Sequence, residues 1–315
     1  MLKKMLYRKI MVASSLLVII FLLYLIPSNN NMVELVEEVE YVYPNNEAVI
    51  YLLDDEEYVS RTKMSVNKDN DIEEAKDLIK GLTEQSEKKD IIPKGFKQII
   101  PKDTSVLDVK LNNKILKINF SKEFYNIKEE YEEKLIESLT YTLTSINGIE
   151  KIEIYVDDQK LEYLPHSKKK LPEYLDKTYG INKVYEISTL NELENYTVYY
   201  TNIENGEPYY IPVTKYINNS NQDKIKVIID ELSTNLIYET NLSSYLDANA
   251  KLLDYEILDN QIKLTFNDKI LSNITDDMIL EEVKYTIGLS LCDEFNVEEV
   301  IFNVGNKTIS TFKLN

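Results

Sequence analysis

With 315 residues and 43% hydrophobic content, the chain is long enough for about two domains with buried cores. Its formal net charge of −18 argues against nucleic acid and anionic lipid headgroups as partners, because both are bound through lysine and arginine. One cysteine, Cys292, excludes an intramolecular disulfide and a cysteine metal cluster. Because His166 is the one histidine of the chain, most histidine-dependent metal sites and catalytic triads are excluded.

The N-terminus carries a candidate membrane anchor. Residues 1–9 are basic, and residues 10–26 form an uncharged apolar run that as a helix would be about 26 Å long, close to the thickness of a bilayer core. The basic flank predicts that residues 1–9 are cytoplasmic and that the chain after Ile26 is extracytoplasmic. The run ends without the small-residue pattern of a cleavage site, so we favour an uncleaved single-pass anchor over a cleaved signal peptide. Residues 27–46 follow as a polar tether.

The first predicted domain spans residues 47–157. Apolar runs predict strands, and apolar stripes at helical spacing predict helices. The expected elements are strands over 48–53 and 58–66, a helix over 72–82, a hairpin over 107–120, a helix over about 129–146 and a strand ending at Val156.

The hairpin pattern occurs twice in the sequence. Leu107 and Phe120 enclose two alternating strands, and Leu253 and Phe266 do the same 146 positions later. We expect each leucine to pair with its phenylalanine, which leaves a two-residue turn in each hairpin. Lys114 is a poor residue for such a turn, so the first turn is expected to be of a different type.

The duplication predicts a second domain over residues 195–315, reached through a linker over 158–194. Its expected elements follow the same order: strands over 196–201 and 208–217, a helix over 223–232, the hairpin over 253–266, a helix from about Leu280 and a strand over 300–304. Pro212 should keep the second of these strands at a sheet edge.

Each copy therefore has the element order β-β-α-β-β-α-β. This order predicts an α+β fold of two tandem small α/β sandwich domains after one N-terminal transmembrane helix. In each domain we expect one mainly antiparallel sheet with its helices on one face.

The tandem pattern resembles the GerM domain family of bacterial sporulation and germination proteins. The resemblance covers about 47–157 well and 195–310 weakly, and the run of Ser, Lys, Glu and Phe over 121–124 is its most telling part. The chain departs from the family pattern in lacking a lipobox cysteine and in having Lys114 where a glycine is common. The matching residues that we expect to have structural roles are Tyr51, Leu107, Phe120, Lys122, Phe124 and Phe266.

The resemblance implies an extracytoplasmic domain related to the ring-building folds of sporulation channels. It also implies a role in assembling the envelope complex between mother cell and forespore, or in germination. Expected partners are other envelope or sporulation proteins and further copies of the chain itself.

Candidate catalytic groups are few. Paired carboxylates can cleave glycosidic bonds, and acidic pairs occur within 54–57, at Asp157–Asp158 and at Asp276–Asp277. In a chain with 54 acidic residues such pairs arise by chance, and we interpret them as solvated turns or helix caps. We interpret His166 as a solvated linker residue. From the sequence we therefore expect that the protein is not an enzyme and that it binds no metal, no cofactor and no small-molecule substrate.

The candidate interaction surface is a group of tyrosines on the first two strands of the second domain, because exposed tyrosines suit interfaces. Its members are Tyr199, Tyr200, Tyr209 and Tyr210. The competing interpretation is that these side chains pack in the core.

The favoured function is a membrane-anchored extracytoplasmic scaffold. The alternatives are an enzyme that modifies spore-cortex peptidoglycan and a module that binds a wall polymer or peptide.

Overall fold

The computed structural model describes residues 46–84, 92–188, 193–204, 206–218, 223–234, 242–273 and 277–314. The predicted cytoplasmic tail over 1–9, the transmembrane helix over 10–26 and the tether up to residue 45 lie outside these residues. Among the helices that are described, none is long and apolar enough to cross a membrane. Residues 46–315 belong to one structural unit.

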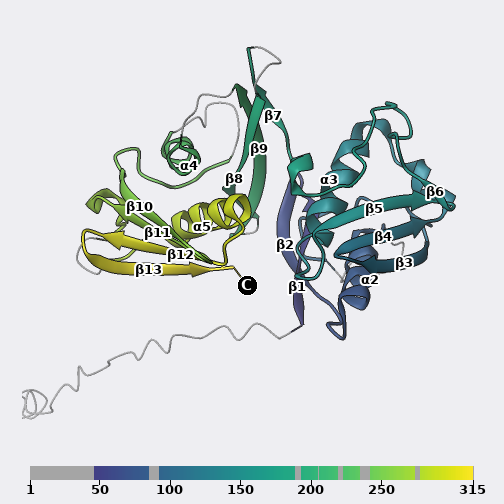
Figure 1. The fold of residues 1–315 in the computed structure, drawn as a ribbon, viewed down its shortest axis with the longest axis horizontal. Helices are drawn as coiled ribbons and strands as arrows, with labels where there is room; N and C mark the ends of the chain where they lie inside the picture. The colour runs from purple at the N-terminus through teal and green to yellow at the C-terminus, as the bar shows by residue number, and fades with distance from the viewer. Residues whose placement is uncertain are drawn as a thin grey trace, which may run out of the picture. The chain divides into compact units, whose positions relative to one another are not determined.

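Each copy contains the predicted succession of strands and helices (Figure 1). The first copy comprises β1 (Glu47–Leu53), β2 (Val59–Ser65), α2 (Asp71–Leu82), β3 (Val106–Asn112), β4 (Ile115–Phe120), α3 (Glu132–Leu143) and β5 (Lys151–Val156). The second comprises β8 (Leu193–Glu204), β9 (Glu207–Asn218), α4 (Lys224–Ser233), β10 (Leu252–Leu258), β11 (Gln261–Phe266), α5 (Glu281–Phe295), β12 (Glu299–Val304) and β13 (Lys307–Lys313). The connection adds β6 (Gln159–Lys160) and β7 (Val184–Glu186), and short 3₁₀ helices η1 (Lys122–Asn126), η2 (Glu129–Tyr131), η3 (Lys177–Tyr179) and η4 (Asp268–Ile270) complete the described elements.

The strands are divided differently from the prediction of one sheet per copy. The orders β3-β4-β5-β6 and β10-β11-β12-β13 form one sheet in each copy. The first hairpins of both copies join in a third sheet with the order β1-β2-β9-β7, and β8 pairs with β9 (Figure 1). Most pairs are antiparallel, but β7 pairs with β9, β4 with β5, and β11 with β12 in parallel. The last two pairs require a crossover helix, α3 or α5, between their strands.

The helices were expected on one face of a single sheet in each copy. Each crossover helix instead packs against two sheets, α3 against β1 and β5, and α5 against β8 and β12. Ser138 and Thr142 of α3 bond the carbonyl and amide of Tyr51 on the free edge of β1, at 2.5 and 2.9 Å. Ser290 of α5 bonds the amide of Tyr199 on β8 in the same way, at 2.8 Å. The hydroxyls thereby satisfy sheet edges that could otherwise pair with another chain.

The hairpin register is confirmed except at its open end. Val109 pairs with Ile118 as predicted, but Val106 rather than Leu107 pairs with Phe120. The second hairpin has the same irregularity, with Leu252 rather than Leu253 opposite its phenylalanine. A β-bulge inserts one extra residue into one strand of a pair. Leu107 and Leu253 are those extra residues and are 52% and 64% exposed, so the predicted pairings of both leucines with their phenylalanines are wrong.

The first hairpin turn has the geometry that its sequence disfavours. Asn113 and Lys114 have φ angles of 50° and 63°, as a two-residue type I′ loop requires. The expectation of another turn type is therefore wrong. The Lys114 carbonyl accepts the backbone amide of Glu150 at 2.9 Å, and its ammonium pairs with the Glu150 carboxylate at 2.6 Å. These contacts hold a residue without glycine's freedom in the left-handed region.

Lys114→Gly should stabilise the protein by about 0.5–1 kcal/mol, because glycine adopts positive φ without steric cost. The lost ion pair is exposed on both sides and offsets only a few tenths of this gain. Lys114→Ala is the matched control, because it removes the ion pair and keeps the strain. Urea unfolding of the three proteins should give the order Gly, Lys, Ala; equal stability of the glycine and alanine variants would contradict the strain.

The predicted linker belongs largely to the first core. Its buried leucines and isoleucine, Leu161, Leu164, Leu171, Leu175 and Ile181, pack with the side chains of α2, α3 and the first sheet. Near the C-terminal end of the predicted linker, β7 pairs in parallel with β9 of the second copy. Residues 158–186 therefore pack against both copies.

Candidate interaction surfaces

The tyrosine cluster predicted to be a free surface is buried. Tyr199 is 1% exposed and Tyr209 and Tyr210 are each 9% exposed, while Tyr200 is half-buried. The strand that carries two of them is not an edge strand, because β9 has β8 on one side and β2 and β7 on the other. The prediction that these tyrosines are exposed on a sheet edge is therefore wrong. Their packing follows the competing interpretation.

Tyr51 and Tyr199 occupy equivalent places on β1 and β8 and meet between the copies. Their hydroxyls lie 2.9 Å apart, and the Tyr199 hydroxyl also donates to the carboxylate of Asp293. Lys177 binds the other carboxylate oxygen. Burial, followed by the nearby Asp293 charge, holds the pKa of Tyr199 well above its usual range, so its hydroxyl stays protonated as a donor. This cluster is a structural junction of the two copies.

The acidic turn over 54–57 makes a second contact between the copies. Asp54 is 2% exposed, and its carboxylate accepts the backbone amides of Glu56 and Tyr58 at 3.0 and 2.8 Å. It also accepts the hydroxyls of Ser60 at 2.9 Å and of Tyr209, from the second copy, at 3.0 Å. The Asp54 carboxylate thus accepts four hydrogen bonds. Three of them hold the turn and the start of β2 in place, and the fourth links the turn to β9.

Burial raises the pKa of Asp54 above its usual value, despite the four hydrogen bonds that favour the charged form. The folded state therefore binds this proton at a pH at which the unfolded chain has released it. Stability relative to the isosteric Asp54→Asn variant should fall as pH rises from about 4 through the raised pKa, and then stay level. Urea-unfolding free energies of both proteins between pH 4 and 7 test this. If the free energy of unfolding of the native protein instead rose relative to that of the variant as pH increases, the raised pKa of Asp54 would be contradicted.

Pro212 lies in the interior of the third sheet because a side chain replaces the missing backbone partner. The Asn182 amide donates to the carbonyls of Pro212 and Val59 at 2.7 and 2.9 Å and accepts the Val59 amide at 2.9 Å. It thereby joins β9 to β2 where these strands diverge. The backbone amide of Asn182 binds the Glu137 carboxylate at 2.9 Å, and Lys183 pairs with the same group at 2.8 Å.

The remaining acidic pairs and the histidine do not converge on one site. Asp157 and Asp158 have positive φ angles in the turn between β5 and β6. Asp277 also has a positive φ angle, whereas Asp276 lies outside the described residues. His166 is exposed, and its ring nitrogen Nε2 lies 2.7 Å from the carbonyl of Ile127. No group of three potential metal ligands occurs in the described part of the chain.

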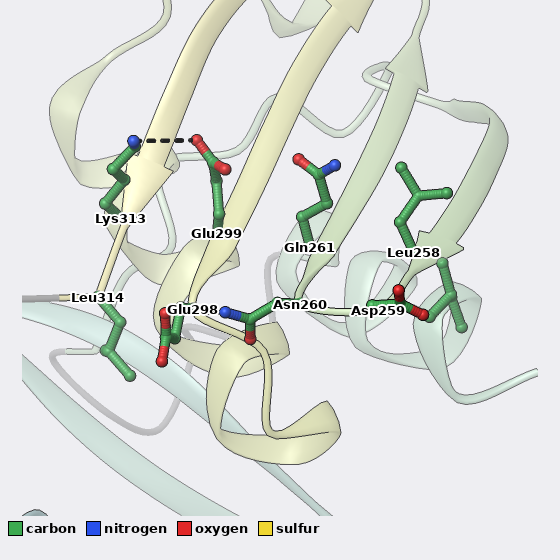
Figure 2. Close-up of a pocket in the computed structure, with 9 residues that line it drawn as sticks. Leu258, Asp259, Asn260, Gln261, Glu298, Glu299, Lys313 and Leu314 are labelled. Atoms are coloured by element: carbon green, nitrogen blue, oxygen red, sulfur yellow. Dashed lines mark hydrogen bonds and ion pairs between the residues drawn. The ribbon is translucent and has the colours of Figure 1, made fainter. Parts of the chain in front are cut away.

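A shallow hollow of about 740 Å³ lies at one end of the second copy's sheet (Figure 2). Figure 2 shows the carboxylate of Glu298 beside the amide of Asn260, and the carboxylate of Glu299 facing the ammonium of Lys313. Asn260 donates to Glu298 at 2.8 Å, and Lys313 pairs with Glu299 at 3.5 Å. Asn260 and Glu298 correspond to the pair Lys114 and Glu150 of the first hairpin. The hollow therefore lies at a turn contact that both copies share. The second copy makes this contact with an amide and a carboxylate in place of the lysine and glutamate of the first.

A larger hollow of about 920 Å³ lies in the first copy, beside the end of β1 at Leu53. Its apolar lining includes Phe96, Ile127 and Tyr131, and four lysines and one glutamate also line it. We call it the lysine groove. Its lysines are Lys94, Lys97, Lys102 and Lys128.

The comparisons with known proteins agree with this duplicated architecture. The model of the Germane family, described as sporulation and spore germination, matches residues 49–162 and again residues 197–310. The chain belongs to the Germane family. It is 31% identical over 239 residues to the spore germination protein GerM of Bacillus subtilis (strain 168), a match that covers 74% of this chain and 65% of that protein. The chain thus spans less than two thirds of that relative's length.

The fold of this Germane chain also resembles a solved structure of a family member. The tandem GerMN domains of the sporulation protein GerM from Bacillus subtilis superpose with a TM-score of 0.75 at 30% identity. The superposition covers 83% of this chain and 91% of that one. The resemblance predicted from the sequence is therefore confirmed for both copies.

The residues that carried the resemblance differ in their structural roles. Phe120 and Phe124 are buried and stack with ring centroids 4.7 Å apart, and Phe266 is buried in the second core. Lys122 is exposed at the start of η1, and Leu107 is the exposed bulge residue. The three phenylalanines of the Germane pattern therefore pack in the cores, whereas its lysine and its leucine face solvent.

The sequence did not indicate Lys177 and Asp293, which complete the junction, or Asn182, which joins β2 to β9. One signal was present: Tyr51 and Tyr199 stand at equivalent places in the two family matches, 148 positions apart. A duplicated polar aromatic residue on a buried strand needs a polar partner, and its own duplicate is one candidate. No comparable signal marked the other three.

Proposed function

We propose that this Germane chain is a membrane-anchored extracytoplasmic interaction protein that acts in spore formation or germination. Family membership supports the process, and the likeness to GerM supports the tandem design. The apolar run over residues 10–26 supports the anchor. Its partners are other envelope or sporulation proteins, and copies of itself.

The observation that carries this proposal is the junction. The first hairpins of both copies form one sheet, and the Tyr199 hydroxyl bonds both the Tyr51 hydroxyl and the Asp293 carboxylate between them. A connected pair of domains presents two outer sheets in a defined arrangement, which suits a scaffold more than two domains joined by a flexible tether would.

A non-catalytic role is part of the proposal. Asp54, the most buried of the acidic candidates that the structure describes, has four hydrogen-bond donors on its carboxylate. Asp157 and Asp158 lie in a turn, where Asp158 exchanges hydrogen bonds with Asn119 at 2.7 and 3.1 Å. Two carboxylates that cleave a sugar chain would instead flank one binding cleft.

The test is affinity purification of the full-length protein from detergent-solubilised membranes of sporulating and of growing cells, followed by mass spectrometry. We expect specific recovery of envelope proteins during sporulation. Recovery of the protein alone in both states would contradict the interaction role. Saturable binding or cleavage of purified peptidoglycan would instead support the alternative of a peptidoglycan-binding or cortex-modifying protein.

Anchoring has a separate test. The full-length protein should stay in the membrane pellet after alkaline carbonate extraction, and its N-terminal residues should be retained. A variant in which residues 10–26 are replaced by a cleavable signal peptide should be released. Release of the native chain in a shortened form would show that the apolar run is a cleaved signal peptide.

A further inference from the structure

The lysine groove is a local reversal of charge in a chain with a net charge of −18. Lys94, Lys97, Lys102 and Lys128 line it, whereas Glu84 is the one acidic residue among the described residues that line it. Lys97 pairs with Asp55 at 2.8 Å, and Lys128 lies 3.7 Å from Glu130. Lys94 and Lys102 are exposed and form no ion pair with any residue that the structure describes. Two cationic side chains are therefore available at the groove.

The floor of the groove is apolar and firmly held. Ile99 and Ile127 are 3% and 6% exposed, and Phe96 packs edge-on against Tyr209 of the second copy with ring centroids 5.2 Å apart. Backbone hydrogen bonds between Leu53 and Lys97, at 2.7 and 3.1 Å, fix the loop to the end of β1. Such a hollow, with an apolar floor and a few charged groups at its rim, has the composition of a ligand site.

The second copy shows that the fold does not need these lysines. It has an equivalent loop, because Thr201 pairs with Ser243 as Leu53 pairs with Lys97. At the hairpin offset of 146 positions, each groove lysine corresponds to an uncharged residue. These residues are Thr240, Ser243, Ala248 and Ile274. The basic rim is therefore a property of the first copy alone, and packing of the shared fold does not account for it.

We propose that the lysine groove binds an extended acidic segment of a partner protein. Carboxylates of that segment would bind Lys94 and Lys102, and its apolar side chains would pack on Phe96, Ile127 and Tyr131. A peptide fits better than a long polyanion, because Asp55, Glu57 and Glu130 contact the groove residues Lys97, Tyr131 and Lys128 and would repel continuous negative charge. The inference rests on the proposed interaction role only for its choice of a protein as the partner.

The test is fluorescence anisotropy of the detergent-solubilised full-length protein with a fluorescein-labelled peptide of about eight residues, in which glutamate alternates with leucine and proline. We expect saturable binding that is lost when glutamine replaces glutamate in the probe. Raising the salt concentration from about 0.1 to about 0.5 M should weaken binding, because the contacts are at the rim.

The decisive variant is the double substitution Lys94→Glu and Lys102→Glu, which should weaken probe binding at least about tenfold. Its matched control is Lys68→Glu with Lys251→Glu, because both of these lysines are exposed and the change in net charge is the same. The control should keep the affinity of the native protein. Circular dichroism and thermal unfolding establish that both variants fold.

Equal weakening in the groove variant and the control, or equal affinity for the glutamate and glutamine probes, would overturn the proposal. Groove-dependent binding to vesicles containing phosphatidylglycerol without binding of the peptide would assign the site to a lipid surface and would overturn it too. Peptide binding together with failure to recover partners from sporulating cells would leave the groove assignment intact and count against the proposed function alone.

Discussion

Tyr199→Ala should lower the free energy of unfolding by about 3–5 kcal/mol, the usual cost of deleting a fully buried aromatic side chain. The ring is 1% exposed, and its hydroxyl links Tyr51 to Asp293 between the copies. Urea unfolding of the full-length protein measures the loss. We expect the slope with denaturant to change as well, if the two copies no longer unfold together.

Tyr199→Phe is the matched control for this experiment. It keeps the ring and removes only the hydroxyl, so it should cost about 1–2 kcal/mol. Asp293 keeps Lys177 as a partner in this variant. A cost below about 1 kcal/mol for the alanine variant, together with loss of partner recovery, would contradict the structural role and return Tyr199 to the list of interface residues.

Lys183→Met should destabilise the protein by about 3–5 kcal/mol, because it leaves a buried carboxylate without its counter-ion. The side chains of Lys183 and Glu137 are 7% and 5% exposed, and the ammonium lies 2.8 Å from the carboxylate. The ammonium also lies 3.7 Å from the centroid of the Tyr179 ring, a cation–π contact that methionine cannot make. Among the described residues, the backbone amide of Asn182 alone would still bind the carboxylate, at 2.9 Å.

The double variant Lys183→Met with Glu137→Leu should recover most of this loss, because a buried ion pair and an apolar pair of similar volume are often close in stability. Recovery of less than half would show that the Asn182 contact to Glu137, rather than the charge pair, is the larger contribution. Both variants are compared by urea unfolding at pH 7.

The single variant should also have a pH dependence of defined sign. Burial raises the pKa of Glu137, and the Lys183 charge opposes this effect. Without Lys183 the pKa should rise further, so the folded state keeps the proton at a pH at which the unfolded chain loses it. The stability of Lys183→Met relative to the double variant should therefore fall as pH increases from about 4 towards neutrality. A difference that stays constant with pH would show that the pKa of Glu137 is the same in the folded and unfolded variant, which would contradict the expected rise.

Local signals in the sequence determined the elements of this protein and their duplication. Period-two alternation around a short turn indicated both hairpins, and the pairs Val109–Ile118 and Leu111–Leu116 followed from it. These predictions hold because side-chain alternation and turn length are set by residues only a few positions apart. The family resemblance was also within reach, since it rests on the same short runs.

The tertiary structure alone decided which sheet edges meet and which polar side chains are buried. The amphipathic tyrosine ring suits a core and an interface equally, so its sequence pattern could not place Tyr199. Strand alternation indicates which residues face one side of a sheet, but not whether β2 continues into β9 of the other copy. That choice depends on long-range partners: the hydroxyls of α3 and α5 that close the outer edges, and the amide of Asn182 that joins β2 to β9 beside Pro212.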